Sequence, residues 1–269
     1  MIIINILTLY LTSHNKDTLP IDRFDRKEMF NFLDWLTRER GIGPRTRNNY
    51  KDYVRTLFTT LVDRGVVNEN PASKVKDLPT KSGRYIIFTD NQKDVLEQHL
   101  QRHNPRLFLF TRFIYYGFMR PVEVCRMQVR NIDVDKRIIL VRNNQSKNKK
   151  QKPVVINPQL LSVIKELGLE KYPEHYYVFG RNRMTSPHFR KRNRYSEDHR
   201  KALDACGIDD PDLDMYSWKH TGNCNAYTKG KVDINSLKIQ NRHGSLKQTE
   251  IYLTALGLRI PVELKTKEW

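Results

Sequence analysis

Hydrophobic residues recur at helical spacing in the first part of the chain. One pattern opens at Asp25, which forms a capping-box sequence with Glu28, and its apolar face carries Met29, Phe32, Leu33 and Leu36. A second pattern opens at Pro44, and its apolar stripe comprises Tyr50, Val54, Leu57, Phe58 and Leu61. Residues 1–12 are mostly apolar and predict a short buried strand or helix. The segment 68–83 is polar and aperiodic, so we predict a linker there.

The periodicity changes in the second part of the chain. Thr89 or Asp90 begins one predicted helix, and Asn104 begins another that ends at Gly117. Residues 137–142 and 153–156 are β-rich and flank a polar, basic segment, which predicts a hairpin. Helical patterns return at 158–167 and dominate from residue 188 onward. We therefore predict a mainly α (α+β) protein, with a helical domain over 1–81 and a mostly helical domain with a small antiparallel β-sheet over 82–269.

The charge balance indicates a polyanionic partner. The chain carries 48 Lys and Arg residues against 30 Asp and Glu residues, a formal net charge of +18, and nucleic acid is the commonest partner of such a chain. No stretch approaches the roughly 18 apolar residues that a membrane span needs, so we expect no membrane partner. A ribosomal or chaperone-like role stays open on charge alone. Arg45, Lys51 and Arg55 on the second helix are candidate DNA contacts, although a solvated polar face explains them equally well.

Several common kinds of site have no sequence support. Cys125, Cys206 and Cys224 form no CxxC pair, which argues against a zinc ribbon or a redox motif. We expect them to be reduced thiols of a cytoplasmic protein. The motifs of P-loop, dinucleotide-binding, zinc-protease and serine-hydrolase sites are absent from the sequence. The sequence therefore predicts no metal site and no cofactor.

Four clusters in the second part carry candidate chemistry. Arg120 and Glu123 follow the helix-ending Gly117, and the bond to Pro121 keeps Arg120 out of helical geometry. The basic hairpin segment contains Lys147. The other two clusters run from Tyr216 through Lys219 to Gly222, and from Arg242 and His243 to Tyr252, nine residues after His243. Singly, each has a plain explanation: an ion pair for Arg120, a solvated loop for Lys147 and core packing for Tyr252.

Taken in order, the four clusters resemble the tyrosine recombinase (phage integrase) family. Its catalytic domain has an Arg after a helix-ending Gly, a Lys on a β-hairpin, a His-x-x-Arg, then a His or Trp, and a Tyr nine residues later. The resemblance covers essentially the whole chain, and it includes an Asn-Pro-Ala run at the end of the first helical part. One position departs from the pattern, because Tyr216-x-x-Lys219 replaces His-x-x-Arg. This departure leaves open which group acts as general base, since the reference pKa of a Tyr is about 10.

The resemblance implies a site-specific recombinase or integrase that forms a covalent 3′-phosphotyrosine without metal or ATP. Residues 1–81 would be the core-binding domain and residues 82–269 the catalytic domain. Tyr252 would attack the phosphate, and Lys147 would protonate the leaving 5′ oxygen. The remaining residues would stabilise or orient the charged groups: Arg120, Lys219, His243, Glu123 and Tyr216.

The family also implies the partners of the chain. It implies double-stranded DNA, a monomer in solution that assembles as a tetramer on two DNA sites, and accessory DNA-bending proteins. The alternative is a DNA-binding protein that has kept the recombinase fold and lost catalysis, and the replacements at Tyr216 and Lys219 motivate it.

Overall fold

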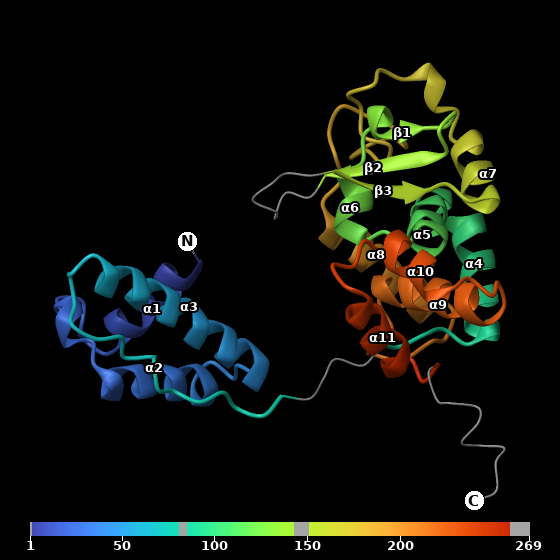
Figure 1. Ribbon diagram of the computed structural model, residues 1–269. Helices are drawn as coiled ribbons and strands as arrows, with labels where there is room; N and C mark the ends of the chain where they lie inside the picture. The colour runs from blue at the N-terminus through green and yellow to red at the C-terminus, as the bar shows by residue number, and fades with distance from the viewer. Residues whose placement is uncertain (1, 81–84, 143–150, 259–269) are drawn as a thin grey trace, which may run out of the picture. The chain divides into compact units, whose positions relative to one another are not determined.

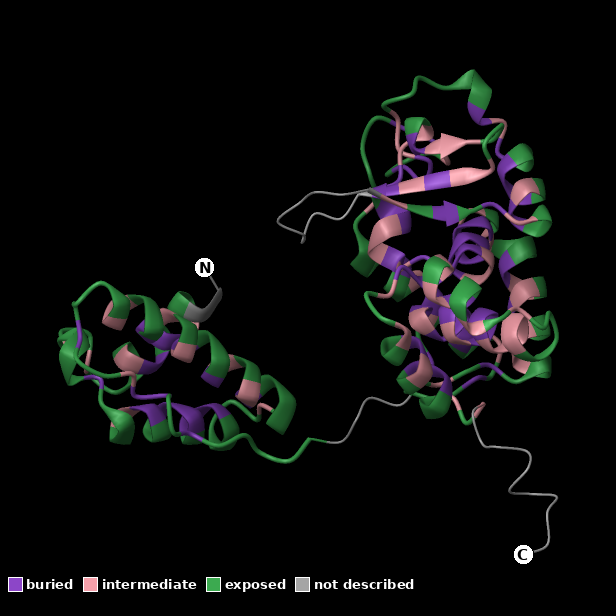
Figure 2. Cartoon of the chain, in the orientation of Figure 1, coloured by how far each residue is buried: buried purple, intermediate pink, exposed green. Residues whose placement is uncertain are grey.

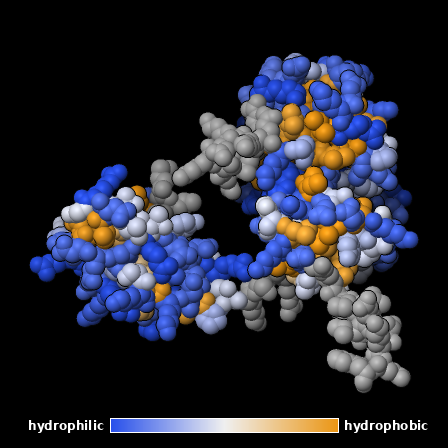
Figure 3. Space-filling model, in the orientation of Figure 1, coloured by the Kyte–Doolittle hydropathy of each residue, from blue (hydrophilic) through white to orange (hydrophobic). Residues whose placement is uncertain are grey.

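The computed structural model describes residues 2–80, 85–142 and 151–258. It divides into two compact units, Met1–Gly83 and Arg84–Trp269 (Figure 1). This division assigns no function to either unit, so the roles expected for residues 1–81 and 82–269 stay predictions. Hydrophilic residues cover most of the first unit on the face shown in Figure 3. Within the described ranges, no helix is both long and apolar enough to cross a membrane.

The first unit consists of helices α1 (Ile2–Ser13), α2 (Arg26–Arg38) and α3 (Pro44–Asp63), with a 3-10 turn η1 at Ile21–Arg23. Its core includes the whole predicted apolar face of α2 (Figure 2). Of the predicted stripe of α3, Val54 and Phe58 are buried in this core, Tyr50 and Leu61 pack against it, and Leu57 does not belong to it. Asp25 caps α2 by accepting a hydrogen bond from the Glu28 amide at 2.8 Å. The Glu28 carboxylate instead accepts bonds from the Tyr10 hydroxyl and the Lys16 ammonium. The second half of the predicted capping box is therefore replaced by a connection between α2 and the end of α1.

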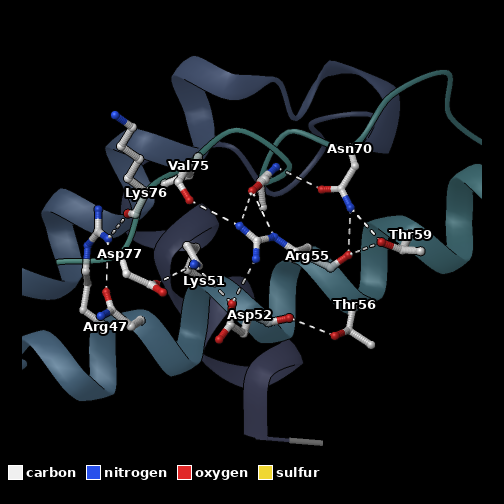
Figure 4. Close-up of polar contacts among 12 residues, drawn as sticks. Arg47, Lys51, Asp52, Arg55, Thr56, Thr59, Asn70, Val75, Lys76 and Asp77 are labelled. Carbon is white, nitrogen blue, oxygen red and sulfur yellow. Dashed lines mark hydrogen bonds and ion pairs between the residues drawn. The ribbon is translucent and has the colours of Figure 1, made fainter. Parts of the chain in front are cut away.

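The segment after α3 packs along that helix (Figure 4). Arg55 donates hydrogen bonds to the carbonyl oxygens of Ala72 and Val75, at 3.2 Å each. Asn48 exchanges two hydrogen bonds with the backbone of Leu78, and the side chains of Ala72 and Val75 are buried. The linker prediction is therefore wrong for residues 70–78, because side chains of α3 bind the backbone of Ala72, Val75, Lys76 and Leu78 and so hold the segment within the first unit.

The second unit begins with α4 (Asp90–His103), α5 (Pro105–Gly117), α6 (Pro121–Cys125) and the 3-10 turn η2 (Val129–Asn131). Strands β1 (Ile132–Asp133), β2 (Ile138–Arg142) and β3 (Gln151–Val155) form an antiparallel sheet in that order. After them come α7 (Pro158–Glu166), η3 (Leu169–Lys171), α8 (Arg192–Ala205), α9 (Met215–Thr228), α10 (Ile234–Asn241) and α11 (Leu246–Ala255). The sheet lies at one end of the unit and α11 at the other (Figure 1). The mainly α prediction with a small antiparallel sheet is confirmed.

The predicted hairpin is formed by β2 and β3, with Ile139 opposite Val154. Residues 143–150 between the strands, including Lys147, lie outside the described residues. The outer edge of β3 contacts α10, where the Gln240 side-chain amide donates to the Val155 carbonyl at 3.0 Å and accepts from the Val155 amide at 2.9 Å. This side chain connects the sheet to α10.

Helix α9 packs closely against α5 at Gly222. A Cβ atom at Gly222 would overlap the backbone oxygen of Tyr115, so no larger residue fits without moving a helix. The neighbouring Thr221 hydroxyl accepts a hydrogen bond from the Phe88 amide at 2.9 Å, and Thr89 caps α4 with a capping box. The close approach at Gly222 and the Thr221 hydrogen bond hold α9, which carries Tyr216 and Lys219, against α5 and Phe88.

We predict that Gly222→Ala destabilises the second unit by about 2 kcal/mol through overpacking. Alanine normally favours a helix interior over glycine by roughly 1 kcal/mol, and here the clash with backbone outweighs that gain. The matched control is Gly244→Ala, because a Cβ there meets only the flexible Gln248 side chain at 3.7 Å. Urea denaturation of both variants measures the difference. A Gly222→Ala protein as stable as wild type would contradict the close packing of α5 and α9.

Candidate active site

Arg120 and Glu123 meet at the turn between α5 and α6. Phe118 ends α5 in the left-handed backbone region, with φ 48°, and α6 begins at Pro121. The Glu123 carboxylate accepts a hydrogen bond from the Arg120 guanidinium at 2.9 Å and another from the Arg120 amide at 2.7 Å. The side chain of Arg120 is 42% exposed, so its guanidinium is oriented by Glu123 and still open to solvent.

Arg242 brings a second guanidinium to the same carboxylate. It ends α10 with φ 60°, and its side chain is only 4% exposed. Its NH2 group donates to the other Glu123 oxygen at 2.6 Å and to the Phe118 carbonyl at 3.3 Å. Lys152 on β3 donates to the Arg242 carbonyl at 3.3 Å. Glu123 therefore holds two cations, Arg120 three residues before it and Arg242 119 residues after it in the chain.

Lys219 adds a third cation from α9. Its Nζ donates to the Phe118 carbonyl at 2.7 Å, and the residue is buried. Burial lowers the pKa of this amine well below its ordinary value, and the charges of Arg242 and Arg120 lower it further. Three cationic side chains thus lie around one backbone carbonyl and one carboxylate. Such a group is suited to an anionic ligand, which would offset their mutual repulsion.

Tyr252 lies on α11 and is 5% exposed. Its hydroxyl is 2.8 Å from Nδ1 of His220, and its ring packs edge-on against Tyr85 and His243, at centroid distances of 5.0 Å and 5.9 Å. Burial raises the pKa of the Tyr252 phenol above its ordinary value. Because the ring is buried, a phosphate can reach the hydroxyl only after α11 or the residues over the ring shift.

His243 lies between α10 and α11 and is oriented by a residue of α11. Its Nδ1 is 2.9 Å from the Thr249 hydroxyl. Burial, together with the charges of Lys219 and Arg120, lowers the pKa of His243 to about 4. The imidazole is therefore neutral at pH 7. A neutral imidazole with one nitrogen held by Thr249 can offer its other nitrogen to a ligand.

The structure brings most of the predicted site residues into one cluster. Arg120 and Glu123 are bonded directly. Lys219 shares the Phe118 carbonyl with Arg242, which is bonded to Glu123, and His243 and Tyr252 pack ring to ring. Tyr216 contributes its ring, which stacks near His220 at 6.3 Å. Across the described part of the chain, no hydrogen bond joins the Tyr252 hydroxyl to any of the three cations. The roles of these residues stay predictions.

Sequence reasoning missed three members of this cluster: Arg242, His220 and Tyr85. Arg242 directly precedes His243 in the sequence, and His220 directly follows Lys219. Their position next to predicted site residues could have identified them. Periodicity carried no signal for Tyr85, which precedes α4. In the described ranges, no group of three or more His, Cys, Asp and Glu side chains is placed to hold a metal ion.

The candidate DNA contacts of the first unit have different surroundings (Figure 4). Lys51 is 2% exposed and pairs with Asp77 and Asp52. Arg55 is bonded to the segment that follows α3, whereas Arg45 is exposed. A solvated face therefore does not describe Lys51, whose ammonium is part of the packing of this unit. DNA contact by these three residues stays a prediction.

The family model for the phage integrase family matches residues 87–257. The chain belongs to the phage integrase family. This match spans α4 to α11 and contains every residue of the cluster except Tyr85. Integrase-family membership agrees with the resemblance noted from the sequence.

Relatives of this integrase-family chain include a Pseudomonas aeruginosa protein described as the tyrosine recombinase XerC. It is 22% identical over 275 residues, which cover 92% of this chain and 63% of that relative. The chain thus spans less than two thirds of the length of that relative.

Two solved structures share the fold. One is lambda integrase (75–356) as a dimer bound to a COC′ core site, with a TM-score of 0.69, 14% identity, and coverage of 91% of this chain and 88% of that one. The other is the Tn1549 transposon integrase in complex with circular intermediate DNA, with a TM-score of 0.68, 15% identity, and coverage of 91% and 86%.

Proposed function

We propose that this chain is a site-specific DNA recombinase that cleaves and rejoins strands through a covalent 3′-phosphotyrosine at Tyr252. The observation that carries the proposal is the cluster in which Arg120, Lys219 and Arg242 surround Phe118 and Glu123. Family membership supports the same reaction class. The net charge of +18 and the DNA complexes formed by proteins of similar fold support double-stranded DNA as the partner.

In the proposed reaction, the Tyr252 oxygen attacks phosphorus and the 5′ oxygen leaves. Negative charge grows on the non-bridging oxygens, and fixed cations and donors stabilise that charge without reorganising. Arg120 is exposed enough to offer two donors to a phosphate, and Lys219 and His243 supply further charge or hydrogen bonds. An arriving phosphate anion would favour the ammonium form of Lys219, opposing the effect of the two guanidinium groups.

Lys147 would protonate the leaving oxygen, and Tyr216 would position the phosphate or Lys219 through its hydroxyl. The phosphotyrosine ester conserves the energy of the broken bond, so rejoining requires neither ATP nor a metal. We further propose that residues 1–81 bind the core of the DNA site. The complete assembly would be a tetramer on two DNA sites, formed from cytoplasmic monomers and assisted by DNA-bending proteins.

The test is a covalent adduct on DNA. A binding site is first selected from a pool of random duplexes and then nicked beside the cleavage position, so that the cleaved fragment diffuses away. The wild-type protein is expected to form an adduct that survives denaturing electrophoresis, and to relax a supercoiled plasmid that carries the site. A protein that binds the duplex but gives neither product would instead be the catalytically inactive DNA-binding protein.

A further inference from the structure

We propose that His220 accepts the proton of Tyr252 during strand cleavage, an inference that rests on the proposed recombinase function. The geometry is direct, because Nδ1 of His220 lies 2.8 Å from the Tyr252 hydroxyl. This distance is within the reach of a general base. His220 lies four residues after Tyr216 on α9, and the two rings stack. The chain thus offers a histidine one helical turn beyond the position where the family pattern has one.

The other candidate bases are engaged elsewhere. Nδ1 of His243 contacts the Thr249 hydroxyl, and Nζ of Lys219 donates to the Phe118 carbonyl. Tyr216 meets His220 through its ring. Among the described side chains, His220 alone forms a hydrogen bond with the Tyr252 hydroxyl. Position therefore distinguishes His220 from every other titratable group in the cluster.

The surroundings of His220 keep its imidazole neutral. The aromatic rings of Tyr85, Tyr216 and Tyr252 face it, and the adjacent Lys219 is the charged group near it. Burial, together with the charge of Lys219, lowers the pKa of His220 to about 4. The imidazole is thus neutral at pH 7, and with its proton on Nε2 it presents a lone pair at Nδ1 to the phenol.

Proton transfer from Tyr252 to so weak a base must accompany bond formation. The phenolic proton becomes acidic only as its oxygen bonds to phosphorus, and the phosphate anion raises the proton affinity of His220 at the same time. In the step, the bond from the Tyr252 oxygen to phosphorus forms and the bond to the 5′ oxygen breaks. The phenolic proton moves to His220, and the leaving oxygen takes a proton from Lys147. During rejoining, the His220 imidazolium returns its proton to the departing phenolate.

The first experiment separates proton transfer from positioning. His220→Asn retains a side-chain oxygen that can accept the Tyr252 hydrogen bond but cannot take up the proton, and His220→Ala removes both functions. On the nicked duplex at pH 7, we expect both variants to form the adduct about 10²- to 10³-fold more slowly than wild type. Their DNA affinity should be unchanged. The matched control is His188→Asn, because His188 is an exposed histidine of the same unit, and its rate should equal that of wild type.

The pH profile is the readout that a purely structural role would not produce. Between pH 6 and 8, His220 stays neutral in the wild-type protein. Its titration therefore does not make the rate of adduct formation depend on pH in this range. In His220→Asn, hydroxide must remove the phenolic proton, and the rate should rise about tenfold per pH unit. 3-Fluorotyrosine is a more acidic phenol than tyrosine. Replacing Tyr252 by it should increase the rate of adduct formation more in the His220→Asn variant than in the otherwise wild-type protein.

The leaving group provides a second separation. A duplex with a bridging 5′ sulfur expels a thiolate, which needs no proton. With this duplex, adduct formation should be restored in the Lys147→Ala variant and should stay slow in the His220→Asn variant. The inference is overturned if His220→Asn forms the adduct at the wild-type rate with the wild-type pH profile. It is also overturned if 3-fluorotyrosine speeds both backgrounds equally. If wild type forms no adduct at all, the recombinase function itself fails, and with it the role of His220.

Discussion

Tyr252→Phe is expected to lower adduct formation by more than about 10⁴-fold, because the substitution removes the only atom that can form the phosphotyrosine bond. The hydroxyl contributes one hydrogen bond, to His220, which is worth about 1 kcal/mol of folding free energy. The fold and the DNA affinity should therefore survive. Electrophoresis of the adduct on nicked DNA measures the loss, and a binding titration with the intact duplex verifies that the variant still recognises its site.

Tyr85→Phe is the matched control, since this ring also packs in the cluster and contacts both His220 and Tyr252. It should form the adduct at a rate close to that of wild type. The nucleophile would have to be another residue if Tyr252→Phe still formed the adduct. Mapping the DNA-linked peptide in the wild-type protein would then identify it.

Glu123→Gln is expected to destabilise the second unit by about 3 kcal/mol. The substitution leaves the Arg242 guanidinium buried without its counter-charge, and it removes the ion pair that orients Arg120. The free energy of unfolding can be measured in urea by hydrogen exchange of peptides from α9, which report on this unit alone.

Glu197→Gln is the control for the loss of an ion pair. Glu197 pairs with Arg194 at 2.9 Å, and both side chains are largely exposed. An exposed pair contributes little, so the change in unfolding free energy should stay within about 0.5 kcal/mol. Equal effects of the two substitutions would mean that Glu123 does not compensate a buried charge.

The helices of this protein follow from local patterns in the sequence. The apolar faces of α2 and α3 and the capping residues Asp25 and Thr89 depend on spacings of a few residues. The paired strands β2 and β3 are consecutive strands of the chain. Local spacing also explains one error. Residues 70–78 have a linker-like composition, and they are ordered by Arg55, which lies 15 or more residues earlier.

The cluster around Glu123 could be predicted only in part. The order of Arg120, Lys219, His243 and Tyr252 along the chain suggested that they meet. No spacing rule could place Arg242 on Glu123, because a contact between residues 119 positions apart depends on the packing of α6 against the end of α10. For the same reason, His220 became a candidate base only when its distance to Tyr252 was known.

The contact between Gln240 and Val155 has a consequence for association between molecules. An outer strand normally presents unpaired amide and carbonyl groups to which a strand of another chain can add. At Val155 both groups are already occupied by one side-chain amide, although the Val155 side chain is 50% exposed. The Gln240 side chain of α10 therefore makes the two hydrogen bonds that a neighbouring strand would otherwise make at Val155. A strand of another molecule can therefore pair with β3 at Val155 only after the Gln240 side chain moves away.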